Sequence, residues 1–286
     1  MRRRALLLST VSLVALLAVR PDLAMAADPY SLPAPNTLPA VSALNGKIGV
    51  FGGGITSDFT LGATGSLAFP LSDHWGGQVD GLLGSAGSGV FYGVGGHLFW
   101  RDPAKGLIGA YASYGGWSAS STVPVSVPSG GVADVSGASV GKVGVEGEAY
   151  LGRVSLEGLA AYQYGTASGF AGKATAAYYA TDNLRLEVSA RELAGLGALG
   201  GAGFEWQPKD TSRFSVFATG AVGPSSYWQA LGGVKMYFGG TAKSLILRQR
   251  EDDPDNALPD DLYQTIGTGG CPVGTHLTHG FCDGNT

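Results

Sequence analysis

Apolar and polar residues alternate along most of the chain between residues 46 and 238. The clearest example is Leu184–Arg191, in which every second residue is apolar and the residues between are polar or charged. Successive side chains of a β-strand point to opposite faces, so this pattern predicts a strand with one apolar and one charged face. A soluble sandwich would show the same alternation with its apolar face turned inward. The pattern alone leaves open whether the apolar face meets protein or lipid.

Alternating segments recur with turn-forming residues between them, as in transmembrane β-barrels. We expect twelve strands, at Gly46–Gly54, Phe59–Phe69, Trp75–Gly84, Val90–Trp100, Leu107–Trp117, Ala138–Leu151, Val154–Tyr164, Lys173–Tyr179, Leu184–Arg191, Ala198–Gln207, Phe214–Val222 and Tyr227–Phe238. Connections after even-numbered strands are short, whereas the others are richer in Gly and Ser, and one, Ser118–Ser136, is long. The sequence therefore predicts an all-β fold, a transmembrane antiparallel up-and-down β-barrel over residues 46–238.

Aromatic residues gather near both ends of the predicted strands. One set lies near the short turns: Phe69, Trp75, Trp100, Tyr179, Phe204, Trp206, Phe214 and Phe238. A second set lies near the opposite ends: Phe59, Tyr114, Trp117, Tyr162, Tyr164 and Trp228. Aromatic belts are typical of the two interfaces of a membrane, and a soluble sandwich gives no reason for them. The two sets therefore favour the barrel.

Both ends of the chain differ from this region. Residues 1–26 have a basic start, an apolar run and a small-residue cleavage site, which predicts a cleaved signal peptide. The alternative, a signal anchor, is disfavoured because the apolar run is shorter than the ~20 residues that a spanning helix needs. Residues 27–45 are rich in proline and predict a disordered periplasmic leader. Residues 239–286 hold three basic and seven acidic residues and predict a disordered periplasmic tail.

Charge and hydropathy exclude some functions. Removal of residues 1–26 leaves 14 basic and 21 acidic residues, a net charge of −7. Nucleic-acid binding depends on neutralising phosphates, so nucleic acid is not an expected partner. No later apolar run reaches helix-spanning length, and a closed barrel is then the remaining way to cross a bilayer.

The polar faces of the predicted strands would line the barrel lumen. Twelve charged residues are assigned to this lining, six of each sign: Asp80, Lys142, Glu146, Glu148, Glu157, Lys173, Arg185, Glu187, Arg191, Glu205, Arg213 and Lys235. All but Asp80 come from the sixth strand onward, and strands one to five supply mainly Gly, Ala, Ser and Thr. The set is consistent with a structural lattice of ion pairs or with a weakly selective pore, because twelve strands lie between packed and open barrels.

Catalytic, cofactor and metal sites are not predicted. Of the four histidines only His97 lies on a predicted strand, with no Ser beside it to serve as a nucleophile. We therefore expect a wall residue there, and no enzyme and no cofactor. Cys271 and Cys282, with His276 and His279, have the residue types of a zinc site. A disulfide between Cys271 and Cys282 is favoured in a secreted chain.

Several phrases, HLFWRDP, YYATDNLRLEVSAR and ALGGVKMYFGG, resemble porin-like outer-membrane β-barrels of Gram-negative bacteria. The resemblance implies an outer-membrane location and contact with outer-membrane lipid. The last strand, Tyr227–Phe238, is similar to the signal that barrel-assembly machinery reads, except that the chain continues beyond the aromatic residue. The expected function is passive passage of small hydrophilic solutes. The alternative is a closed structural or surface-interaction barrel, with the tail as a contact for the cell wall or a periplasmic protein.

Overall fold

The computed structural model describes residues 38–260, apart from 56–57, 88, 127–131, 195 and 225–226, together with 276–278 and 281–283. The predicted signal peptide and most of the predicted leader lie outside these residues. No helix in the described part of the chain has the length and apolar character needed to cross a membrane.

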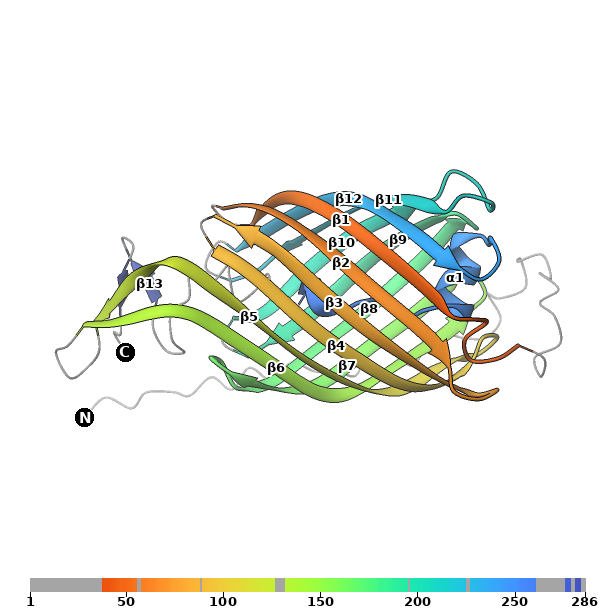
Figure 1. The fold of residues 1–286 in the computed structure, drawn as a ribbon, viewed down its shortest axis with the longest axis horizontal. Coiled ribbons are helices and arrows are strands. Elements are labelled where there is room, and N and C mark those ends of the chain that lie inside the picture. The colour runs from red at the N-terminus through yellow and green to blue at the C-terminus, as the bar shows by residue number, and fades with distance from the viewer. Residues whose placement is uncertain are drawn as a thin grey trace, which may run out of the picture. The chain divides into compact units, whose positions relative to one another are not determined.

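Twelve antiparallel strands form a closed barrel, as the sequence predicted (Figure 1). They are β1 (Asn45–Ile55), β2 (Asp58–Pro70), β3 (Trp75–Ala86), β4 (Gly89–Asp102), β5 (Gly106–Ser126), β6 (Val132–Leu151), β7 (Val154–Gly165), β8 (Gly169–Thr181), β9 (Leu184–Leu193), β10 (Gly197–Trp206), β11 (Phe214–Val222) and β12 (Trp228–Gly239). Each strand pairs with its neighbours in sequence, and β1 pairs with β12 to close the sheet. Closure pairs both edges of every strand, so no edge is left open to lipid.

The outer wall of the barrel is apolar, as the alternation predicted. On β9, Leu186 and Val188 are 42% and 61% exposed, whereas Arg185 between its apolar neighbours is 4% exposed. The same arrangement holds on β2, where Phe59 and Leu61 face outward. An apolar exterior of this extent is stable only in a bilayer, which agrees with an outer-membrane barrel.

The connection expected at Ser118–Ser136 is mostly strand. β5 continues to Ser126 and β6 begins at Val132, so the two strands form a long hairpin beyond the other strands (Figure 1). The pairing shifts register between Ser118 and Val123, where the hairpin leaves the barrel wall. The prediction of a long loop was wrong because Val and Thr in this stretch favour an extended strand despite two prolines.

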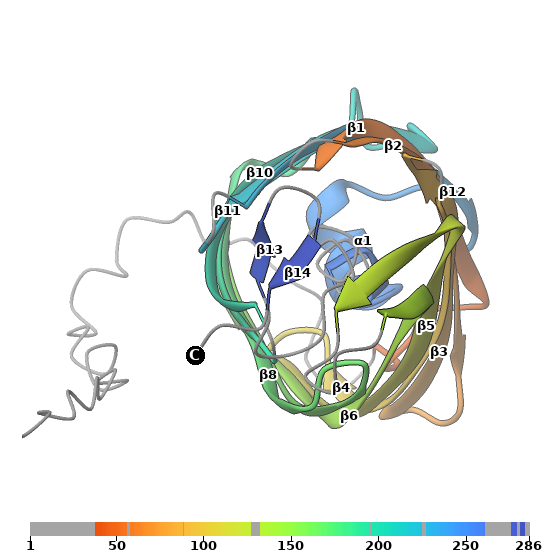
Figure 2. The same ribbon diagram turned by 90° about the vertical axis from the view of Figure 1, so that its left-hand side faces the viewer.

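The predicted disordered periplasmic tail is wrong for residues 239–260. Helix α1 (Leu245–Glu251) follows β12 and lies within the ring of strands (Figures 1 and 2). Residues 252–260, here called the lumen segment, continue into the barrel interior, where Asp253 and Leu258 are 4% and 1% exposed. The acidic residues of this stretch are ordered because they form ion pairs with basic side chains of the barrel wall.

The end of the predicted leader is also ordered. Val41 is fully buried and packs with Ala68, Phe99 and Leu107 at the short-turn end of the barrel. The Arg101 guanidinium donates to the Ala40 carbonyl at 3.0 Å. Ser42 donates to Asp252 Oδ1 at 2.6 Å. The segment that precedes β1 and the segment that follows β12 are therefore in contact at this mouth.

Candidate functional site in the barrel lumen

Helix α1 anchors the start of the lumen segment at the short turns. The Leu245 amide donates to Asn183 Oδ1 at 3.1 Å, and the Ile246 amide donates to the Asp182 carbonyl at 3.0 Å. Arg248 Nε donates to Gln207 Oε1 at 3.2 Å. The turn Asp182-Asn183, which starts β9, thus also holds the helix that follows β12.

The first part of the lumen segment contacts β1, β2 and β3. Lys47 on β1 forms an ion pair with Asp253, and its Nζ donates to the Pro254 carbonyl at 2.9 Å. Gln78 Nε2 on β3 donates to the same carbonyl at 3.1 Å. A proline in this position leaves no amide of its own to satisfy, while its carbonyl receives two donors.

Asp255 and Asp260 bind basic residues of the wall farther along. Asp255 lies 3.2 Å from Arg185, which also contacts Glu157 at 2.8 Å and Glu187 at 2.5 Å. Asp260 bridges two strands, with Lys173 Nζ at 2.6 Å and Arg191 at 2.8 Å. Within the described residues, the ion pairs of Lys173 and Arg191 both go to Asp260, a carboxylate of the segment.

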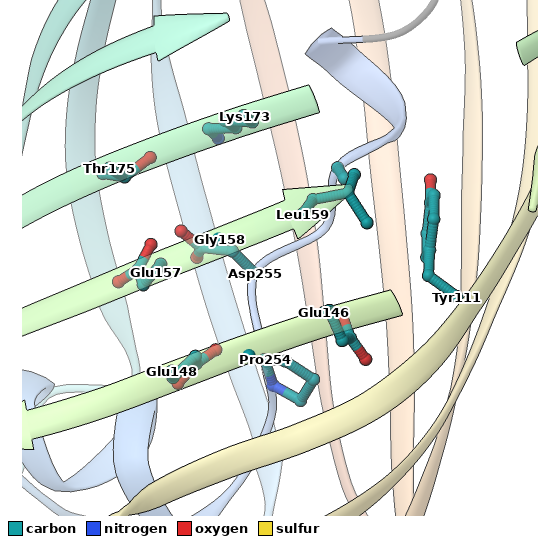
Figure 3. A pocket seen from close by; sticks show the side chains of 12 residues that line it. Tyr111, Glu146, Glu148, Glu157, Gly158, Leu159, Lys173, Thr175, Pro254 and Asp255 are labelled. Carbon is teal, nitrogen blue, oxygen red and sulfur yellow. The ribbon is translucent and has the colours of Figure 1, made fainter. Parts of the chain in front are cut away.

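Wall carboxylates face the segment from β6 and β7. Glu148 and Glu157 are directly opposite each other in the β6–β7 register. Figure 3 shows them, with Glu146 and Lys173, on adjacent strands around the stretch that carries Pro254 and Asp255. A cavity of about 50 Å³ separates this stretch from the wall. Like charges directly opposite repel, and the Arg185 guanidinium, which donates to Glu157, offsets this repulsion.

A second, larger cavity also borders the lumen segment. It measures about 110 Å³ and is bounded by Lys47, Arg185, Glu205, Lys235 and Asp260, among others. Glu205 accepts a bond from Ser215 at 2.6 Å and pairs with Lys235 at 2.6 Å. A cavity of this size with charged lining residues has room for water.

Apolar residues close around the far part of the lumen segment. Leu258 belongs to a buried cluster with ten wall residues: Phe51, Ile55, Leu82, Ala86, Phe91, Leu193, Leu199, Ala221, Tyr227 and Leu231. The Phe51 and Phe91 rings stack with centroids 6.5 Å apart. Gly62 makes room for this, because a Cβ there would lie 2.3 Å from the Phe51 ring. The lumen therefore changes from charged to apolar along its length.

His97 joins two strands of the lumen wall. Its Nε2 lies 2.9 Å from Asp80 Oδ2, and its Nδ1 lies 2.8 Å from Glu146 Oε2. The imidazole also packs on the Tyr111 ring, with centroids 4.8 Å apart. Both ring nitrogens are used by carboxylates.

The predicted lining residues divide into two groups. Eleven of the twelve lie on strand faces turned to the lumen: Asp80, Lys142, Glu146, Glu148, Glu157, Lys173, Arg185, Glu187, Arg191, Glu205 and Lys235. Arg213 does not. It lies in the turn before β11, is exposed, and donates to the Gly239 carbonyl at 3.3 Å.

Sequence reasoning missed the residues that make the site distinctive. Lys47 is the single charged residue of β1, so the sequence marks no charged face on this strand, and only the structure places its side chain in the lumen. Asp253, Asp255 and Asp260 belong to the predicted periplasmic tail. One signal for them is present in the sequence: an acidic run follows directly after strands that carry basic residues on their polar faces. The predicted Cys271–Cys282 disulfide lies outside the described residues, because Cys271 is not among them.

No family model matches the chain, and no curated protein is similar to it in sequence. Among solved structures, it is similar to the KdgM porin with a TM-score of 0.50 at 8% identity, covering 68% of this chain and 99% of that one. An outer membrane channel from Pseudomonas putida F1 gives a TM-score of 0.47 at 10% identity, covering 74% and 98%. The Salmonella typhi outer membrane phospholipase dimer with bound calcium gives 0.45 at 12% identity, covering 75% and 95%. The likeness to KdgM shows the fold, and the chain is porin-like in architecture.

Proposed function

We propose that this outer-membrane barrel passes small hydrophilic solutes, and that its lumen segment limits the passage. The observation that carries the proposal is the content of the lumen. A separate stretch of chain, residues 252–260, lies in the interior and contacts the wall side chains that line it. A wall that presents Lys47, Arg185 and Arg191 inward suits a water-filled path once the stretch is displaced.

Electrostatics supports a segment that can leave and return. Its contacts with the wall are mainly ion pairs and hydrogen bonds at Asp253, Asp255, Asn256 and Asp260. Water in an open lumen can solvate these groups, so the free energy of release is smaller than it would be in a dry core. The cavity of about 110 Å³ beside the segment already gives water a place there.

A closed structural barrel is the second candidate. The apolar cluster around Leu258, with Phe51, Phe91 and Leu231, favours it because such a cluster excludes water and ions from one end of the lumen. A catalytic role has less support. Both nitrogens of His97 contact carboxylates, so neither is available to activate a hydroxyl nucleophile.

Planar-bilayer recording distinguishes the two candidates. The triple variant Asp253→Asn, Asp255→Asn, Asp260→Asn removes the ion pairs of the segment and should raise single-channel conductance or open time severalfold over the wild type. A charge-matched control changes the exposed Asp58 and Asp73 to Asn and the exposed Glu192 to Gln, and should leave conductance unchanged. Silence of both variants, with the barrel shown to be folded by its heat-modifiable mobility, would establish the closed barrel.

A further inference from the structure

The lumen segment has a direction, and we propose that it carries the following part of the chain through the barrel to the cell surface. Residues after Asp260 would then lie at the mouth opposite the short turns. This differs from a tail that starts and ends in the periplasm, and it does not depend on whether the barrel conducts.

The segment enters at the short-turn mouth. Arg250 of α1 donates to the Gly152 carbonyl at 2.7 Å, in the β6–β7 turn. Arg248 donates to the Ser212 carbonyl at 3.1 Å, in the β10–β11 turn, and Ile246 contacts the β8–β9 turn. Three short turns thus surround the helix. Short turns mark the periplasmic end of an outer-membrane barrel.

Positions along strand β9 show how far the lumen segment extends through the barrel. It runs from the Asp182-Asn183 turn toward the opposite mouth. Asp255 pairs with Arg185, its second residue, and Asp260 pairs with Arg191, its eighth. Six residues of strand span about 20 Å. The segment therefore advances from the periplasmic end of β9 into its outer part between Asp255 and Asp260.

The apolar cluster gives the same direction independently. Leu258 packs in a cluster that contains the last residues of three strands that end at the outer mouth: Ile55, Ala86 and Leu193. A segment that turned back after Pro254 would place Leu258 near Val41 and Phe99 instead, in the separate cluster at the periplasmic end.

The positions of the described residues after the lumen segment agree with this direction. Strands β13 (His276–Thr278) and β14 (Phe281–Asp283) pair with each other, and β14 lies against β5. In Figure 1, β13 lies near the far end of the long β5–β6 hairpin, at the opposite end from α1. The proposed external region thus contains the β13–β14 hairpin, with an outer strand of the barrel as its neighbour.

Cysteine labelling of intact cells tests this topology. In full-length protein carrying Cys271→Ser and Cys282→Ser, the substitution Thr286→Cys places one thiol at the end of the chain. A maleimide on a polyethylene glycol too large to pass porins should label it in intact cells. Matched single-cysteine controls are Ser168→Cys in the β7–β8 connection, which should label in intact cells, and Asp210→Cys in the β10–β11 turn, which should label only after permeabilisation.

The outcomes are separable from those of the conductance experiment. Labelling of Thr286→Cys to the extent of Ser168→Cys supports threading, even if no variant conducts. Labelling only after permeabilisation, as for Asp210→Cys, would overturn it and return the end of the chain to the periplasm, where a cell-wall or periplasmic partner could reach it. The same labelling in the background with Asp253, Asp255 and Asp260 changed to Asn should move toward the periplasmic pattern, because the segment then loses its wall contacts.

Discussion

Single residues on β9 show how one strand serves two environments. Leu186 and Val188 are exposed on the outer wall, and Arg185 and Arg191 are buried in the lumen. The alternation of side chains on a strand is enough to predict this division, and it needs no knowledge of the neighbours. What each lumen residue binds is a separate matter, because its partners come from distant strands and from the lumen segment.

Substitution on the outer face of β9 tests the assignment of its two faces. Leu186→Arg or Val188→Arg should lower the free energy of unfolding by ~2–4 kcal/mol near mid-bilayer, because a guanidinium is then exposed to hydrocarbon. Ser189→Arg, on the lumen face of the same strand, should cost less because carboxylates and water are within reach. Urea titration of the folded barrel in lipid gives the three values. Equal costs at the three sites would contradict the assignment of faces.

Removal of Arg185 tests the wall electrostatics. Arg185→Ala leaves Glu157, Glu187 and Asp255 without their shared cation and should cost about 3–5 kcal/mol, the usual range for breaking a buried pair. The control Arg153→Ala breaks a pair with Asp182 that is 45% and 32% exposed and should cost about 0–1 kcal/mol. The comparison is again by urea titration. A cost at Arg185 no larger than at Arg153 would show that water in the lumen replaces the guanidinium.

At the scale of elements, two segments differ from their predictions. The sequence predicts a long loop at Ser118–Ser136 and a disordered periplasmic tail over residues 239–286. In the structure β5 and β6 extend as paired strands beyond the other strands, and residues 252–260 lie in the lumen. Local sequence gave the polarity of both segments correctly. A polar segment is stable either in water or against partners of opposite charge. For the acidic residues 252–260, the barrel wall supplies these partners.

Shortening the long hairpin tests which element occupies the lumen. Replacement of residues 119–136 by Asn-Gly, a dipeptide suited to a two-residue hairpin turn, should leave single-channel behaviour at its wild-type level. The paired positions Ser118 and Gly137 remain to close the hairpin. Bilayer recording of the shortened barrel is the measurement. A large gain in conductance on shortening alone would show that this hairpin, not the lumen segment, blocks the path.

At the scale of the molecule, the outer wall and the closed sheet indicate one location. A closed barrel with an apolar exterior is stable in the outer membrane, and its fold is that of outer-membrane porins. Residues 1–26 are expected to direct the chain across the inner membrane and to be removed.

Fractionation of a Gram-negative host tests the whole arrangement. The mature chain should be recovered in the outer-membrane fraction with Ala27 at its N-terminus. Non-reducing mass spectrometry of the same sample should show Cys271 and Cys282 joined within one chain. In the chain-entropy model, closing this short loop raises the free energy of the unfolded chain by about 2–3 kcal/mol. Recovery of the mature chain in the soluble fraction would contradict the barrel in a membrane. Zinc retained through purification would contradict the disulfide.

Sequence by itself determined the twelve strands, their alternate faces and the lumen position of residues such as Arg185 and Glu205, because these depend on the period of a strand and on local turn chemistry. It also determined that residues 239–260 are too acidic to form a core alone. Tertiary structure decided where those residues go. The partners of Asp253, Asp255 and Asp260 are Lys47, Arg185, Lys173 and Arg191, from strands β1, β8 and β9. These basic groups converge only when the barrel closes, so their combined attraction for the acidic segment exists in the fold and not in any stretch of the sequence.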